Sequence, residues 1–124
     1  MRILFAIIAL LIAPAAYAQT ARVAVLSWIN PTQYTDGSAL PPTNIAETCS
    51  GYSLVSGGPY TVGTQCFIGS VSTGTFTLPA TPVCGKFYFT AWTVDTSGNT
   101  SAVSNEAVKT LPCRPLPPTN LTVN

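Results

Sequence analysis

Short runs of β-branched and aromatic residues alternate along the chain with clusters of Gly, Pro, Asn and Ser. None of the runs after the first twenty residues repeats with the period of a helix. This alternation, broken at short intervals by turn residues, predicts an all-β sandwich or barrel. The runs that we expect to form strands are Arg22–Trp28, Thr48–Val55, Tyr60–Ser70, Gly74–Leu78, Lys86–Val94 and Ala102–Thr110.

The segment Ser56–Pro59 contains two glycines and a proline, and we expect it to form a tight hairpin turn. If that turn is centred between Gly57 and Gly58, Cys49 lies directly opposite Cys66 on the next strand. Cross-strand neighbours have Cβ atoms within reach of a disulfide. The turn therefore predicts a Cys49–Cys66 disulfide.

A second tight turn is predicted at Thr96–Asn99, between the last two strands. With this turn centred between Ser97 and Gly98, Cys84 falls two positions short of facing Cys113. One bulge, or a slight splay of the strand ends, removes that offset. We therefore expect a Cys84–Cys113 disulfide. Crossed pairing is the alternative, because four cysteines allow three connectivities.

The beginning of the chain has the pattern of a cleaved export signal. Arg2 precedes the apolar run Ile3–Ala13, and Ala16–Ala18 supplies small residues at a cleavage site. These features predict a secretory signal peptide at residues 1–18 and a mature protein that begins at Gln19. A membrane anchor is the alternative, but the run is shorter than the about 20 apolar residues that span a bilayer.

The composition agrees with export. All four cysteines lie beyond residue 18, and an even number of cysteines in a small exported domain predicts disulfides. The net charge of +1 falls to zero when Arg2 is removed, so we expect no nucleic-acid partner and no stable membrane insertion after cleavage. We expect the mature protein in the periplasm, at the cell surface or outside the cell.

Little in the sequence points to catalysis. The chain has no His, the commonest general base and metal ligand. Asp95, next to a predicted turn, is expected to cap that turn. We therefore predict no enzyme activity, no metal and no cofactor. The carboxylates stand alone in the sequence, at Asp36, Glu47, Asp95 and Glu106.

Three segments carry a family resemblance. They are Val25–Trp28 with the loop residues Pro31, Thr32 and Asp36–Ser38, then Gly51–Val55, then Lys86–Glu106. Together they resemble bacterial fibronectin type III domains over roughly residues 22–111. The resemblance implies an immunoglobulin-like β-sandwich of two sheets. It also implies a binding, spacer or structural module that has no shared catalytic site.

The resemblance also sorts the side chains of the strands. It places Tyr88 and Trp92 on the outer face, where exposed aromatic rings stack on sugars or anchor a protein contact. The alternative is that a loop covers both rings. The side chains that it directs into the core are Leu26, Trp28, Tyr52, Leu54, Phe87, Phe89 and Ala91.

The first strand of the resembled domain is missing from its usual place. Only Gln19–Ala21 separate the predicted cleavage site from the second strand, too few residues to supply it. The chain therefore divides into a signal at 1–18, a fibronectin type III-like sandwich at 19–113 and a Pro-rich tail at 114–124. Within this tail, the part that resembles the missing first strand consists of Thr119, Asn120, Leu121, Thr122 and Val123.

These observations predict donor-strand exchange, in which each copy lends its tail strand to the open sheet edge of the next. The expected protein is an exported, non-enzymatic structural or adhesion subunit that assembles head to tail with itself, or with other surface or virion proteins. Two alternatives stay open for the tail: a free tail, or the remnant of a tandem array. The alternative function is a monomeric secreted module that binds a carbohydrate or a protein. The sequence leaves a bacterium and a bacterial virus equally open as the source.

Overall fold

The computed structural model describes residues 22–124, so the predicted signal peptide and Gln19–Ala21 lie outside the described residues. The described part is all-β, as predicted, apart from one short 3-10 helix. No helix in it is long and apolar enough to cross a membrane. Its elements are β1 (Val23–Ser27), η1 (Pro42–Asn44), β2 (Ile45–Ser53), β3 (Gly63–Ile68), β4 (Thr73–Thr77), β5 (Gly85–Asp95) and β6 (Ala107–Leu111).

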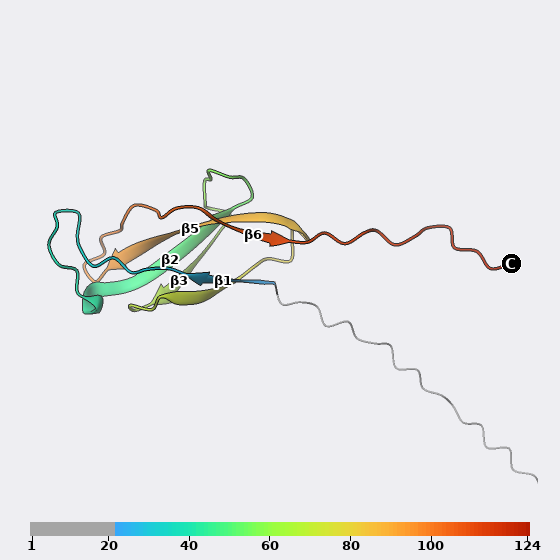
Figure 1. Ribbon diagram of the computed structural model, residues 1–124. Coiled ribbons are helices and arrows are strands. Elements are labelled where there is room, and N and C mark those ends of the chain that lie inside the picture. Colours follow the sequence, from blue (N-terminus) through green and yellow to red (C-terminus); the bar gives the residue numbers. More distant parts are fainter. Residues whose placement is uncertain (1–21) are drawn as a thin grey trace, which may run out of the picture.

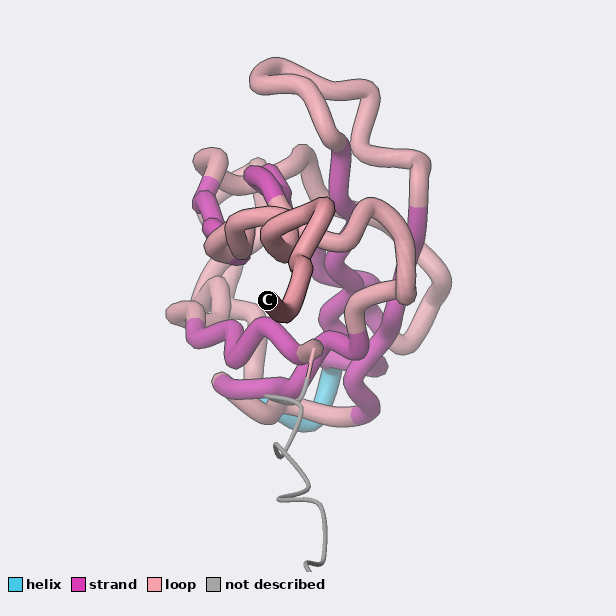
Figure 2. The backbone as a smooth tube through the Cα atoms, turned by 90° about the vertical axis from the view of Figure 1, so that its right-hand side faces the viewer, coloured by secondary structure: helices cyan, strands magenta, loops and turns pink. Residues whose placement is uncertain are grey.

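The strands form two antiparallel sheets (Figure 1). One sheet has four strands in the order β3-β2-β5-β6, and the other has only β1 and β4. β1 begins and β6 ends at the same end of the domain, and the C-terminal tail leaves from that end (Figure 1). Figure 2 looks at the domain from this end, with the tail toward the viewer.

The core lies between the two sheets and is largely aromatic. Tyr52 of β2 packs against Phe76 of β4 and Phe87 of β5, with ring centroids 5.7 and 5.6 Å apart. The inward direction predicted for Tyr52, Phe87 and Phe89 is confirmed, because all three are buried in this cluster. The prediction for Leu54 is wrong: β2 ends at Ser53, so Leu54 starts a loop and is 43% exposed.

Both predicted disulfides are confirmed. Cys49 lies directly opposite Cys66 in the β2–β3 register, and their Cα atoms are 4.0 Å apart. Cys84 lies directly before β5 and Cys113 lies two residues after β6, and their Cα atoms are 4.9 Å apart. Two disulfides in so short a chain indicate an oxidising, extracytoplasmic compartment.

The connection between β2 and β3 differs from the prediction. The tight turn expected at Ser56–Pro59 is part of a longer loop, residues 54–62, that separates the two strands. Within this loop the Gly58 N–H donates to the carbonyl of Val55 at 3.2 Å. The register of the hairpin is nevertheless the predicted one. Tyr52 stands opposite Gly63, so the pairing is still centred between Gly57 and Gly58.

The turn at Thr96–Asn99 is confirmed, and Asp95 caps it as predicted. The Asp95 carboxylate accepts hydrogen bonds from the N–H groups of Ser97 and Asn99 at 3.0 and 2.7 Å. Its other oxygen accepts one from the Asn99 side chain at 3.0 Å. These hydrogen bonds hold the pKa of Asp95 below its ordinary value, and the bond from the Asn99 side chain has the largest effect.

The last strand starts later than predicted, at Ala107 instead of Ala102. Near the turn Val94 bridges Thr100, whereas further along Phe89 stands opposite Ala107. The returning chain therefore contains two more residues than β5 over this stretch. The regular ladder is broken here by the extra residues, as it is at a β-bulge.

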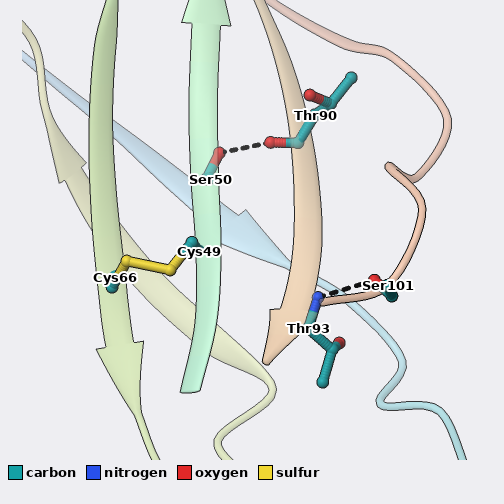
Figure 3. Close-up of a disulfide and its surroundings, with 6 residues drawn as sticks. All are labelled: Cys49, Ser50, Cys66, Thr90, Thr93 and Ser101. Atoms are coloured by element: carbon teal, nitrogen blue, oxygen red, sulfur yellow. Dashed lines mark hydrogen bonds between the residues drawn. A yellow bond between two sulfur atoms is a disulfide. The ribbon is translucent and has the colours of Figure 1, made fainter. Parts of the chain in front are cut away.

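Two serines take the place of the ladder in this stretch. The Ser101 N–H donates to the Thr93 carbonyl at 2.9 Å. The Ser101 hydroxyl accepts from the Thr93 N–H, also at 2.9 Å (Figure 3). Ser104 bonds Ala91 in the same way, at 2.7 and 3.0 Å. The two hydroxyls thus accept hydrogen bonds from β5 N–H groups where the backbone of the returning segment is out of register.

We predict that the Cys84→Ser/Cys113→Ser double variant loses about 3 kcal/mol of unfolding free energy, because the disulfide closes a loop of roughly 30 residues. Urea denaturation followed by tryptophan fluorescence measures the loss. The Cys49→Ser/Cys66→Ser variant serves as a comparison, with a slightly smaller loss for its shorter loop. A loss below about 1 kcal/mol for the first variant would contradict this assignment of its role.

Candidate functional site: the open edge of β1

The strand β1 uses one of its two edges for pairing within the domain. The Trp28 N–H donates to the Ser72 carbonyl at 2.9 Å, and the Leu78 N–H donates to the Arg22 carbonyl at 2.7 Å. Successive residues of an antiparallel strand direct their backbone groups to opposite edges. Even-numbered residues of β1 therefore bond β4, and the groups that face away from β4 belong to Val23, Val25 and Ser27. Within residues 22–124 no strand pairs with this second edge.

The matching edge of β4 is covered by a side chain. The Gln65 amide group donates to the Thr75 carbonyl at 2.9 Å, and its oxygen accepts from the Thr77 N–H at 3.2 Å. The side chain thus makes the bonds that a further strand would make. Sequence reasoning missed this role, although a Gln between Gly63 and Phe67 on the inward face of β3 was a signal for it.

A groove runs along the open edge of β1, between β1 and β6. It consists of two adjoining hollows of about 460 and 410 Å³. Leu26, Phe89 and Ala107 line both hollows, so the two lie next to each other. We call this feature the edge groove. Phe89 is also a residue of the buried core, so the groove lies directly beside the core of the domain.

The start of β1 is held firmly in place. Arg22 donates from Nε to the Pro79 carbonyl at 2.8 Å and from a terminal nitrogen to the Val83 carbonyl at 2.7 Å. A third bond reaches the Pro82 carbonyl. The loop that follows β4 is therefore tied to the strand whose other edge is open, a role that the sequence did not indicate for Arg22.

The predicted donor strand lies away from the edge groove of its own domain. The tail is extended beyond β6, and its apolar side chains are in the open: Leu121 is 90% and Val123 is 95% exposed. It leaves from the end at which β1 begins (Figure 1). The groove and Thr119–Val123 are thus both present, but they are not brought together within one chain.

The second candidate surface, Tyr88 and Trp92, is half-buried. Trp92 stands opposite Cys49, and its ring lies over Gly51. A Cβ atom on Gly51 would come within 3.3 Å of that ring and 2.3 Å of the Tyr60 carbonyl oxygen. The 54–62 loop therefore packs on the outer face of the sheet, next to the Trp92 ring.

Glu106 fastens this loop to the start of β6. Its carboxylate accepts hydrogen bonds from the Ser56 hydroxyl at 2.7 Å, the Gly57 N–H at 2.8 Å and the Tyr60 hydroxyl at 2.5 Å. These hydrogen bonds, above all the one from the Gly57 N–H, lower the pKa of Glu106. The hydrogen bond to Glu106 raises the pKa of the Tyr60 phenol. Nothing in the sequence indicated this anchor, because its partners lie about fifty residues away.

The group of side chains in residues 22–124 that comes nearest to a metal site consists of Glu47, Cys49 and Cys66. Their sulfur atoms are joined in a disulfide. Cys ligates metals as the thiolate. With both thiols oxidised, this group offers a single carboxylate, and we assign no metal to it.

We predict that the 54–62 loop detaches from Glu106 in acid. The pKa of Glu106 is lower in the folded protein than in the unfolded chain, so its stabilising effect is complete near neutrality and is lost as the pH falls through the folded pKa. Hydrogen exchange at the Gly57 amide and Trp92 fluorescence, measured between pH 7 and pH 3, should report the release. In Glu106→Gln this acid transition should be missing, and an identical transition in both proteins would contradict the assignment.

No family model, no curated protein and no solved structure matches this chain. The features of residues 22–124 that bear on function are the open edge of β1, the edge groove beside it and the exposed tail strand.

Proposed function

We propose that this protein is an exported, non-enzymatic structural subunit with a fibronectin type III-like sandwich whose first strand comes from another copy. The donor is Thr119–Val123 of one subunit, and the acceptor is the open edge of β1 in the next. The observation that carries the proposal is the row of backbone groups at Val23, Val25 and Ser27 beside the edge groove. An added strand would bond these groups and cover the core.

The direction of the chain favours a donor from another molecule. A donor antiparallel to β1 must enter where β1 ends, but the tail leaves where β1 begins (Figure 1). Ser27 and Ala91 line the same hollow, so Ser27 lies about 20 Å along β5 from Gly85. The spacer Arg114–Pro118 spans at most about 17 Å and would also have to reverse its direction. A neighbouring subunit stacked on this end requires neither.

The geometry also sets the form of the assembly. The tail leaves one end of the subunit, and an antiparallel donor enters the edge groove at the other end, so each contact leaves a free donor at one end and a free edge at the other. Such a head-to-tail contact builds open filaments, not closed dimers. The Pro-rich spacer is extended and semi-rigid, which suits a segment that passes from one stacked domain to the next.

The donor side chains supply the apolar part of the contact. Leu121 and Val123 are almost fully exposed in the free tail. Burying each against the core would contribute about 1.5–3 kcal/mol. Since about 1.4 kcal/mol is a tenfold change in affinity, either side chain alone should matter for assembly.

We predict that the mature protein forms a ladder of oligomers and that deletion of residues 115–124 leaves a folded monomer. Size-exclusion chromatography with light scattering measures the change. Leu121→Asp should have the effect of the deletion, whereas Leu116→Asp, in the spacer, should still polymerise. Equal assembly with and without the tail would end this proposal, and a monomer in both cases would favour a binding module instead.

We predict that Val25→Pro blocks the acceptor and leaves the domain folded. The Val25 N–H faces away from β4, so proline removes a bond to the donor but none within the sheet. Mixing Val25→Pro, which retains its tail, with the tail-deleted chain should give one-to-one dimers, because only one donor and one acceptor remain. Analytical ultracentrifugation separates dimers from longer species. Longer species from this mixture would show that another surface joins the subunits.

A further inference from the structure

We propose that the donor strand binds in one register, with Leu121, Thr122 and Val123 of one subunit opposite Leu26, Val25 and Ala24 of the next. This inference rests on the proposed function and adds which residues meet. The register follows from three features of the described residues: the side-chain alternation, the free-edge hydrogen bonds taken with the position of Pro118, and the position of Trp28.

The alternation of side chains limits the register to every second position. Ala24 is buried and Leu26 packs against the core, whereas Val25 is 75% exposed on the outer face. Residues directly opposite each other in an antiparallel pair have side chains on the same face. Leu121 and Val123 reach the core only if they stand opposite even-numbered residues of β1, and a slip of one residue would turn both outward.

The free-edge hydrogen bonds exclude one of the remaining registers. Val23, Val25 and Ser27 each offer an N–H and a carbonyl at this edge, and each needs a donor residue with an N–H of its own. If Leu121 stood opposite Ala24, Pro118 would stand opposite Ser27. Proline has no N–H, so that register loses a bond at a bonding position.

The position of Trp28 argues against a shift in the other direction. If Leu121 stood opposite Trp28, the backbone groups of Val23 would stay unpaired. The Trp28 ring is already engaged, with Phe67 at 5.6 Å and through its indole N–H with Asn30 at 2.9 Å. The hollow lined by Val23–Leu26 would receive no leucine.

The proposed register satisfies all three features. Asn120, Thr122 and Asn124 then stand opposite Ser27, Val25 and Val23, and each has the N–H that the bond requires. Val123 enters the hollow beside the small side chain of Ala24, and Leu121 reaches Leu26, which lines both hollows.

The same register gives a partner to the most exposed apolar side chain near the groove. Ile29 lies two residues beyond the end of β1 and is 97% exposed. In this register Pro118 stands opposite Ile29, two residues beyond the Asn120–Ser27 pair and outside β1. The pyrrolidine ring then covers the isoleucine, and the missing N–H costs no bond of β1.

Pairing requires one change in the tail. Asn120 has a φ of 57° in the free tail, in the left-handed region, and must become extended in the bound strand. Asn is among the residues that visit the left-handed region as single positions, so this residue can move between the two conformations. In the free tail this residue therefore interrupts the extended conformation that a paired strand requires.

Disulfide trapping tests the register. The acceptor is Val25→Cys in the chain that lacks residues 115–124, and the donor is Thr122→Cys in the full chain with Val25→Pro. Two matched donors carry Asn120→Cys or Asn124→Cys instead, also on the outward side of the strand. Opposed residues have Cα atoms about 5.5 Å apart, within disulfide range, whereas residues two positions away lie beyond about 7 Å.

We expect the Thr122 donor to form cross-linked dimers at least about fivefold faster than either matched donor, as measured on non-reducing gels after mild oxidation. Preferential trapping by Asn120→Cys or Asn124→Cys would overturn the register while leaving strand exchange in place. Trapping by none of the three donors, in chains whose assembly still requires the tail, would show that the tail does not lie beside Val25. Trapping by none, with assembly independent of the tail, would overturn the proposed function as well.

Discussion

The hydrogen-bonding groups of the β1 backbone are the constraint around which this domain is organised. A strand presents its N–H and carbonyl groups to two edges in alternation, and β4 bonds only those on one edge. The other row, at Val23, Val25 and Ser27, lies beside a groove that opens onto Phe89 and the core. A strand that pairs there would therefore complete a sheet and close a core in the same step.

Elsewhere in residues 22–124, polar side chains bond backbone groups that have no strand or turn partner. Gln65 makes the bonds of an absent strand along β4, and Ser101 and Ser104 do the same for β5 where the ladder is out of register. Glu106 holds the 54–62 loop on the outer face of the four-stranded sheet through three hydrogen bonds. An unpaired edge invites association with other chains. The contrast between a capped β4 and an open β1 is what makes the second edge of β1 suited to a partner strand.

Sequence reasoning succeeded where the relevant partners are close along the chain. Turn residues and a period of two located the six strands, and the hairpin geometry paired Cys49 with Cys66 and Cys84 with Cys113. It failed for Leu54, because the strand ends at Ser53, two residues earlier than expected. It also failed for the start of β6. Residues 101–104 have the alternation of a strand, but the hydroxyls of Ser101 and Ser104 make bonds there that the backbone would make in a regular ladder.

By itself the sequence determined the all-β class, the approximate strand positions and the favoured disulfide pairing, because each depends on alternation and on turns between neighbours in the chain. The tertiary structure decided which sheet edges are covered, which loop packs next to Trp92 and where a groove lies beside the core. Those outcomes depend on single hydrogen bonds between residues far apart in the chain, such as Tyr60 with Glu106 or Arg22 with Pro79. A polar side chain has the same identity whether it faces water or a distant backbone group, so only the folded arrangement tells the two apart.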